Sequence, residues 1–245
     1  MPGYFSQDTK ECLEELLARP GVGLAKIRAP HGSGKSTTLV AWIWKFIENL
    51  RSSGKVYTLL YLKHTLLEAE LLYEYLTSRR FHDGVLKDFV HPINLLPTQA
   101  PLKSKVMIMT SESFKKAVDI FKVRAAFGGD VVILLDEEIA PSADGELVKG
   151  LIISLVEEQL EKKPLLSAKI ISLSLPADDE KMKPFESRLK AKVTVCPVRS
   201  PCRDEPNAHA EVFDSKDGTP LAKDISTAVC FGTNVVSFLP SSLTL

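Results

Sequence analysis

Six consecutive residues near the N-terminus have the types and spacing that bind phosphate. They are Gly32, Ser33, Gly34, Lys35, Ser36 and Thr37. Glycines let successive backbone N–H groups turn toward one anion, and the positive end of a following helix strengthens that field. The Lys35 ammonium suits the outer phosphates and the Ser36 hydroxyl is a hard ligand for Mg²⁺. We therefore expect this loop to bind ATP with Mg²⁺.

A pair of carboxylates about one hundred residues later would complete such a site. Asp136 and Glu137 directly follow residues 131–135, a continuous apolar run typical of a strand buried on both faces. An aspartate at the end of a strand can hold Mg²⁺ through water, so Ser36 and Asp136 are the predicted metal ligands. Glu137 is the predicted catalytic residue, which orients and deprotonates the attacking water. The alternative interpretation is a solvated acidic loop, because most runs of acidic residues are.

Apolar runs of strand length alternate with segments of helical periodicity, which indicates a parallel sheet with crossover helices. Strands are expected at residues 24–29, 56–62, 106–109, 131–135 and 168–173. Helices are expected at residues 9–18, 35–50, 66–78, 112–121 and 146–161. The phosphate-binding segment then joins the first strand to the second helix, as its chemistry requires. The sequence predicts an α/β domain with a mostly parallel central sheet.

Composition favours a globular intracellular protein without a nucleic-acid-binding charge excess. The 31 basic and 31 acidic side chains balance, whereas a strongly basic surface is the usual mark of nucleic-acid binding. No apolar run approaches the length of a membrane span, and residues 1–10 do not resemble a secretory signal. The four cysteines form no C-x-x-C pair, so reduced thiols are expected. We expect a cytoplasmic or nuclear location, no secretion and no membrane partner.

The character of the sequence changes near residue 176, where prolines become frequent and apolar runs become short. We assign residues 1–180 to the nucleotide-binding domain. Residues 181–245 are interpreted as a Pro-rich linker and the start of an incomplete second domain. Within them, residues 234–240 have the pattern of a strand followed by a turn.

These segments together resemble the first RecA-like domain of superfamily 2 helicases, in particular the DEAH/DExH group. Residues 29–37 are similar to that group's A-P-T-G-S-G-K-[ST], and residues 136–139 stand in its D-E-x-H position. Residues 59–69, 106–111 and 170–176 are similar, in order, to three further motifs. The resemblance implies a three-layer RecA-like P-loop NTPase fold and a nucleic-acid-dependent ATPase or helicase, with RNA favoured over DNA. It also implies that Thr65 and Thr110 contact the nucleic-acid backbone.

The chain departs from the family pattern at several positions. Ile139 replaces the histidine of D-E-x-H, Pro176 the threonine of S-A-T, and Leu66 an arginine that touches the nucleic-acid backbone. In the family, that histidine and threonine link the ATP site to strand separation. Residues 193–201 loosely resemble the linker to a second domain, yet no arginine-rich Q-x-x-G-R-x-G-R element occurs. The resemblance therefore implies weak or no ATP hydrolysis by this chain alone.

Three functions remain open at this level. The first is the ATP-binding domain of a helicase, which would show nucleic-acid-stimulated hydrolysis. The second is a degenerate, non-catalytic nucleotide-binding module that docks to a protein partner. The third is a small-molecule kinase or another transferase, which ranks last because no basic lid segment follows the core.

Overall fold

The structure is a computed structural model, and its described residues all belong to the unit Met1–Pro201. The described residues are 7–29, 34–51, 54–55, 57–78, 89–90, 106–119, 129–136, 143–174, 181–196 and 198. Gly32, Ser33 and the predicted catalytic residue Glu137 lie outside this part of the chain, as do Ile139 and the strand expected at residues 234–240.

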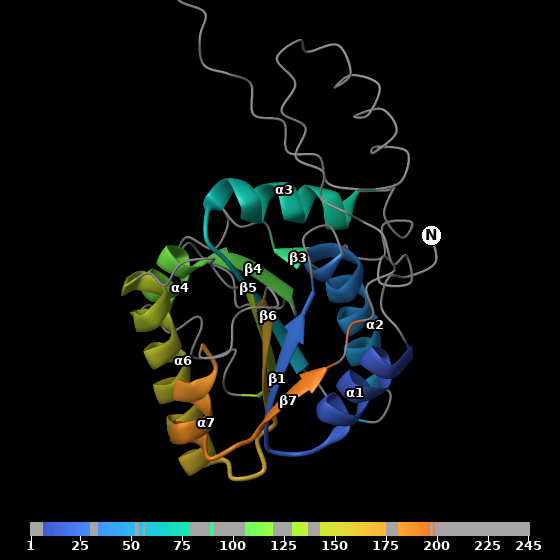
Figure 1. Ribbon diagram of the computed structural model, residues 1–245. Helices are drawn as coiled ribbons and strands as arrows, with labels where there is room; N and C mark the ends of the chain where they lie inside the picture. The colour runs from blue at the N-terminus through green and yellow to red at the C-terminus, as the bar shows by residue number, and fades with distance from the viewer. Residues whose placement is uncertain are drawn as a thin grey trace, which may run out of the picture. The chain divides into compact units, whose positions relative to one another are not determined.

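Within the described part of the chain, seven parallel strands form one sheet in the order β3-β4-β2-β5-β6-β1-β7. The strands are β1 (Val22–Arg28), β2 (Tyr57–Lys63), β3 (Phe89–Val90), β4 (Val106–Thr110), β5 (Asp130–Asp136), β6 (Ala168–Ser174) and β7 (Val193–Cys196). Because all strands run the same way, the carboxyl ends of β1, β2, β4, β5 and β6 meet at one edge of the sheet (Figure 1). The loops at this edge are where parallel α/β sheets place ligands.

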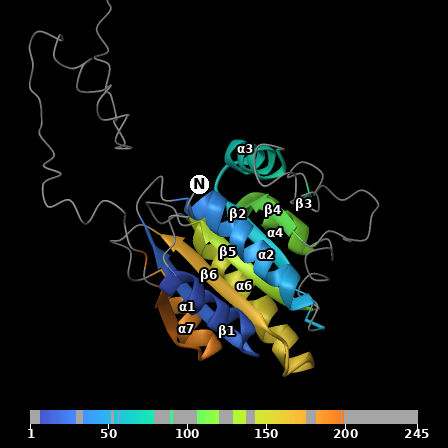
Figure 2. The same ribbon diagram turned by 90° about the vertical axis from the view of Figure 1, so that its right-hand side faces the viewer.

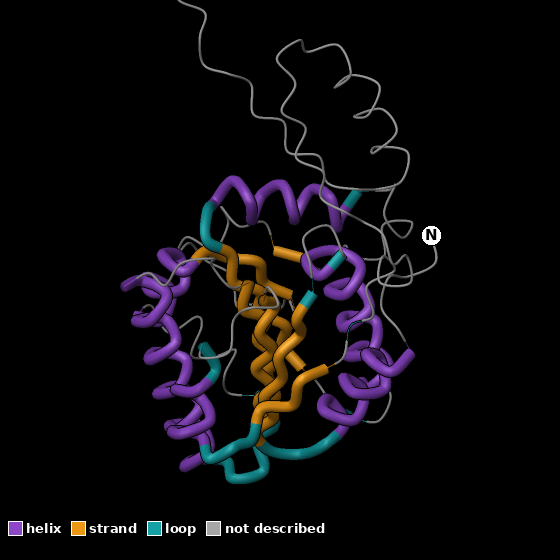
Figure 3. Tube along the Cα trace, in the orientation of Figure 1, coloured by secondary structure: helices purple, strands orange, loops and turns teal. Residues whose placement is uncertain are grey.

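Helices cover both faces of the sheet and give the domain three layers (Figures 1 and 3). They are α1 (Gln7–Ala18), α2 (Val40–Arg51), α3 (Leu66–Thr77), α4 (Ser111–Asp119), α6 (Ala143–Lys162) and α7 (Lys183–Leu189). Helices α1 and α2 lie on one face, in front of the strands in Figure 2, and α4, α6 and α7 lie on the other. Helix α3 lies across the carboxyl edge of the sheet (Figure 1).

Alternating side chains of the central strands fill two separate apolar cores. Val132 and Leu134 of β5 pack with α1 and α2, whereas Ile133 and Leu135 of the same strand pack with α4 and α6. A strand covered on both faces needs apolar side chains at every position, which explains its unbroken apolar sequence. Large buried side chains anchor both faces, among them Trp44 on α2 and Phe114 on α4.

The α/β fold class is confirmed, with a central sheet that is parallel throughout its described part. The five strands and five helices expected between residues 9 and 173 are each present within a few residues of their expected bounds. Three short elements, β3, α7 and β7, were not expected. Helix α7 is seven residues long with a proline in its first turn, and β7 buries only Cys196, so neither carries a clear periodic signal.

Strand β7 bears on the domain boundary placed near residue 180. It pairs in parallel with β1, from Leu24 opposite Val193 to Ile27 opposite Cys196. The described part of the sheet therefore extends to Cys196, into the beginning of the segment that was compared with a linker. The remainder of the predicted second region, from residue 199 on, lies outside the described residues.

A buried lysine fixes the opposite, amino-terminal edge of the sheet. Lys169 on β6 is fully buried, and its Nζ donates hydrogen bonds to the backbone oxygens of Arg19 at 2.7 Å and Gly21 at 2.8 Å. Its stem packs so closely on Gly23 of β1 that a Cβ there would lie 2.9 Å from the lysine Cδ. Burial of the ammonium lowers the pKa of Lys169 from 10.5 to about 8.

This depressed pKa predicts a pH-dependent contribution to stability. The unfolded chain keeps the Lys169 proton up to about pH 10.5, while the folded chain loses it near pH 8, so unfolding becomes less favourable as the pH rises through this window. Relative to Lys169→Met, the wild type should gain up to about 3 kcal/mol in unfolding free energy between pH 8 and 10.5. Urea unfolding at a series of pH values measures this difference.

The control for that series is Lys162→Met, which removes an exposed lysine from the same edge of the sheet. Its stability difference from the wild type should stay flat across the window. A flat or falling difference for Lys169→Met would contradict the assignment of a charged, desolvated ammonium at this position.

Candidate functional site

The described half of the phosphate-binding segment turns sharply from β1 into α2. Gly34 has a φ of +82°, in the left-handed region that glycine enters without strain. Lys35–Leu39 then form a wide π-helical turn, in which the Leu39 N–H donates to the Gly34 oxygen at 3.1 Å. Single π-turns are rare and occur frequently at functional sites. The turn presents the beginning of the α2 helix to the carboxyl edge of the sheet.

Lys35 is folded back across this turn. Its Nζ donates a hydrogen bond to the backbone oxygen of Ala29, which directly follows β1. Burial lowers the pKa of the Lys35 ammonium, and the nearby Asp136 carboxylate partly offsets that effect. The ammonium is thus held, partly desolvated, at the mouth of the loop.

Asp136, at the end of β5, is joined to the loop across 100 residues of sequence. The Ser36 hydroxyl donates a hydrogen bond to Asp136 Oδ2 at 3.3 Å. This contact brings together the two residues that the sequence predicted as metal ligands. Strand β6 separates β5 from β1 in the sheet, so the Ser36 hydroxyl reaches Asp136 from the loop above these strands.

Strand β2 adds two further partners to the same carboxylate oxygen. The Tyr61 hydroxyl donates to Asp136 Oδ2 at 3.0 Å, and the Lys63 ammonium forms an ion pair with it. Burial, followed by the charge of Asp136, raises the pKa of Tyr61 well above its usual value, so the phenol remains a donor. Three donors therefore fix the carboxylate of Asp136 through one oxygen.

Tyr61 and Lys63 were not among the site residues expected from the sequence. The two-residue period of a strand could have indicated them, because Leu59, Tyr61 and Lys63 lie on one face of β2, and that face carries Asp136. What the sequence lacks is the strand order, which puts β2 directly beside β5.

The oxygens of Ser36 and Asp136 fit a magnesium ion that also binds phosphate. Mg²⁺ prefers hard oxygen ligands and commonly takes only one or two protein groups beside substrate phosphates and water. The described residues include no cluster of three or more His, Cys, Asp or Glu side chains placed to hold a metal ion.

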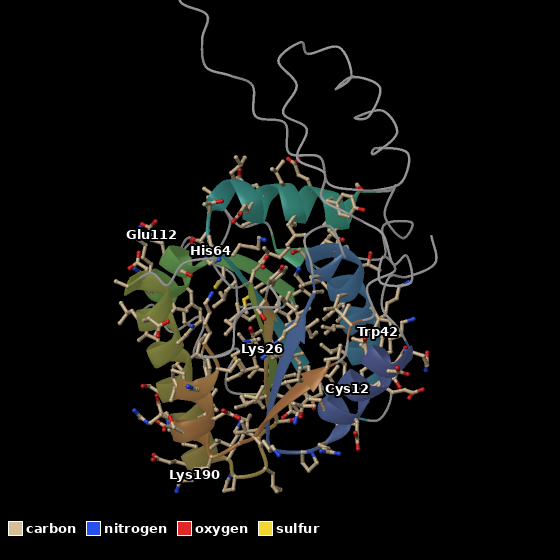
Figure 4. All side chains as sticks on the ribbon, viewed as in Figure 1. Cys12, Lys26, Trp42, His64, Glu112 and Lys190 are labelled. Carbon is tan, nitrogen blue, oxygen red and sulfur yellow. The ribbon has the colours of Figure 1, made fainter. Side chains whose placement is uncertain are left out.

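A second polar group lies on the other face of the sheet, at the ends of β1 and β6. Lys26 and Arg28 are opposite Ser172 and Ser174 in the strand register. The hydroxyls of Ser172 and Ser174 are buried and have no hydrogen-bond partner among the described residues. Figure 4 shows Lys26 within the sheet, below the carboxyl edge. Of this group, the family resemblance pointed only to Ser174, and the two basic residues were missed because a lysine in a core strand is unexpected.

The two threonines expected to contact nucleic acid are helix caps in this structure. The Thr65 side chain accepts from the Glu68 N–H at 3.2 Å in a capping box that begins α3. The Thr110 side chain accepts from the Ser113 N–H at 3.0 Å at the start of α4. These local bonds account for both hydroxyls, and contact with nucleic acid stays a prediction.

Helix α3, which follows Thr65, has an acidic and apolar surface. Its sequence contains three glutamates and no lysine or arginine. Leu67, Leu71 and Tyr75, spaced four residues apart along one stripe, are 65%, 57% and 49% exposed. In Figure 4 His64 lies between this helix and α4, beside the carboxyl edge.

A cavity of about 780 Å³ lies away from this site, at the amino-terminal edge of the sheet. Arg19, Lys169, Lys190 and Lys192 are among its lining residues. Lys190 marks that edge in Figure 4, opposite the end where Asp136 terminates β5. The chemistry of the loop and Asp136 therefore belongs to a different part of the domain from this cavity.

No protein-family model matches this chain, and no curated protein sequence matches it. The fold and the contacts around Asp136 therefore carry the functional assignment. Across the described residues, no helix combines the length and the apolar character needed to cross a membrane.

The left-handed conformation of Gly34 makes a stability prediction with a matched control. Gly34→Ala places a Cβ where φ is +82° and should lower the unfolding free energy by about 1–2 kcal/mol. Gly150→Ala, at an open position in the middle of α6, should raise it by about 0.5–1 kcal/mol. Urea denaturation of both variants checks the opposite signs, and a stabilising Gly34→Ala would rule out the observed turn.

Proposed function

We propose that this chain is the MgATP-binding domain of a nucleic-acid-dependent ATPase of DEAH/DExH type, with RNA as the favoured nucleic acid. The observation that carries the proposal is the hydrogen bond between Ser36 and Asp136 at the carboxyl edge of a parallel sheet. Phosphate-loop ATPases use the same parts. They have a turn that begins with glycine and carries a lysine and a hydroxyl, and they have an aspartate at the end of a neighbouring strand. The likeness of residues 29–37 and 136–139 to that helicase group supports the more specific assignment.

Each residue has a distinct part in the proposed site. Lys35 exchanges the Ala29 oxygen for the outer phosphates, since a charged ligand is a better partner for an ammonium than a single carbonyl. Ser36 and Asp136 hold Mg²⁺, which when bound neutralises charge on the phosphates during their cleavage. Tyr61 keeps Asp136 oriented through its hydroxyl. Glu137, outside the described residues, remains the predicted base for the attacking water.

ATP binding is the first test of this proposal. Lys35→Ala should weaken MgATP binding about ten- to one-hundredfold, because it removes charge-assisted hydrogen bonds to the triphosphate. Lys45→Ala, which removes an exposed lysine from helix α2 directly after the turn, should bind like the wild type. Isothermal titration calorimetry on the full chain measures both. Equal affinities for the two variants, or no binding by the wild type, would exclude a phosphate-loop site.

The second candidate function is a non-catalytic nucleotide-binding module that docks to a protein. The observation in its favour is the acidic, apolar surface of α3, which follows the segment that resembles a nucleic-acid-binding motif. Glutamates that flank Leu67 and Leu71 repel a phosphate backbone and suit a basic, apolar partner instead. The replacement of the coupling residues by Ile139 and Pro176 agrees with this candidate.

Turnover separates the two candidates. The sequence contains no arginine-rich helicase motif, and lack of an arginine finger costs about 10³–10⁵ in rate, so hydrolysis by the chain alone should be slow. We expect MgATP hydrolysis that exceeds a Lys35→Ala control and rises with single-stranded RNA more than with DNA of the same sequence. MgATP binding with no turnover above that control, with or without nucleic acid, would exclude the ATPase and favour the docking module.

A further inference from the structure

Lys63 occupies an unusual place for a lysine in the proposed site. It ends β2, directly beside β5, and its ammonium pairs with the carboxylate that is proposed to hold Mg²⁺. The two side chains are only 11% and 17% exposed, so water screens the pair weakly. The Lys63 Nζ also lies 5.7 Å from the centroid of the Tyr61 ring, which adds an attractive contact for a cation. Lys63 is therefore held in this place by two independent contacts.

A lysine and a divalent cation compete for the same carboxylate. Asp136 bears a single negative charge, and Lys63 already neutralises it in the structure. Mg²⁺ that approaches the carboxylate meets a positive charge within a partly buried site, where the repulsion between cations is stronger than in water. Ser36 also donates to Asp136 Oδ2, so both proposed metal ligands are engaged in the network that includes Lys63.

We propose that Lys63 is the resident counter-cation of Asp136, and that Mg²⁺ binds there only when this ammonium moves away. The inference rests on the proposed nucleotide site and specifies how its metal dependence is set. Lys63 acts here as a positioning residue, since it reaches the metal through Asp136.

When a nucleotide is present, the displaced Lys63 ammonium can pair with its phosphates. Lys63 is opposite Thr110 in the register of β2 and β4, so it lies at the same carboxyl edge as the phosphate-binding turn. An ATP molecule without metal carries excess negative charge, and Lys35 and Lys63 together supply two cations to offset it. The wild type should therefore bind metal-free ATP nearly as well as MgATP.

The experiment compares ATP affinity in excess Mg²⁺ with ATP affinity in EDTA, by calorimetry on the full chain. For the wild type, Mg²⁺ should improve the affinity by less than about threefold. For Lys63→Met, which keeps the stem and removes the charge, metal-free binding should weaken and MgATP binding should tighten. The ratio of the two dissociation constants should then rise at least about tenfold, as expected for loss of one charge-assisted contact.

Two variants and one additional ligand complete the design. Lys63→Arg retains the positive charge and should restore the low ratio, while Lys162→Met removes a lysine at the opposite edge and should behave like the wild type. Mn²⁺ alone, followed by electron paramagnetic resonance, should bind nucleotide-free Lys63→Met more tightly than the wild type. This readout does not depend on ATP or on hydrolysis.

The outcomes distinguish this inference from the function on which it rests. If the wild type binds no ATP in either condition, the proposed function fails. If the wild type binds ATP and Lys63→Met leaves both the ratio and Mn²⁺ binding unchanged, the role of Lys63 is wrong and the nucleotide site stands. A wild-type ratio above about thirtyfold overturns the role of Lys63 even if the variant does not fold, because such a gain is incompatible with a competing lysine.

Discussion

The hydrogen bond between Ser36 and Asp136 joins two parts of the chain that only the sheet brings together. It depends on one topological constraint, since all described strands are parallel and their carboxyl ends meet at the same edge. Short apolar strands form that edge. Helices α1 and α2 bury one face of these strands, and α4 and α6 bury the other. As a consequence, the turn at Gly34 lies at the same edge of the sheet as the polar ends of β2, β5 and β6.

The network around Asp136 joins the turn at Gly34 to the ends of strands β2 and β5. Tyr61, Lys63 and Ser36 all approach one oxygen of the carboxylate, and Lys35 is held on the Ala29 oxygen close by. Each of these contacts uses a group that a metal or a phosphate would also engage. Binding would then exchange the partners of these side chains, and side chains that are already ordered lose less conformational entropy on binding. The same exchange makes nucleotide affinity sensitive to the cations already present.

Much of the fold and part of the site could be predicted from the sequence. Unbroken apolar runs such as residues 131–135 indicate central strands, and the glycine-lysine-serine pattern specifies its own strand-to-helix context. The α7 and β7 elements were missed because Phe185 and Cys196 are their only fully buried side chains. Tyr61 and Lys63 were missed because strand order, which no local pattern encodes, decides that β2 lies beside β5. The roles assigned to Glu137 and to Gly32 and Ser33 stay predictions, since these residues lie outside the described part of the chain.

The central claim is that Ser36 and Asp136 act together on one MgATP, and a double-mutant cycle for MgATP binding tests it most directly. Ser36→Ala, Asp136→Asn and the double variant would each be titrated with MgATP and compared with the wild type. If both side chains hold the same metal, the second substitution should add little to the first, with an interaction energy close to the loss that either single substitution causes. Additive losses, or single variants that bind MgATP like the wild type, would contradict a shared site.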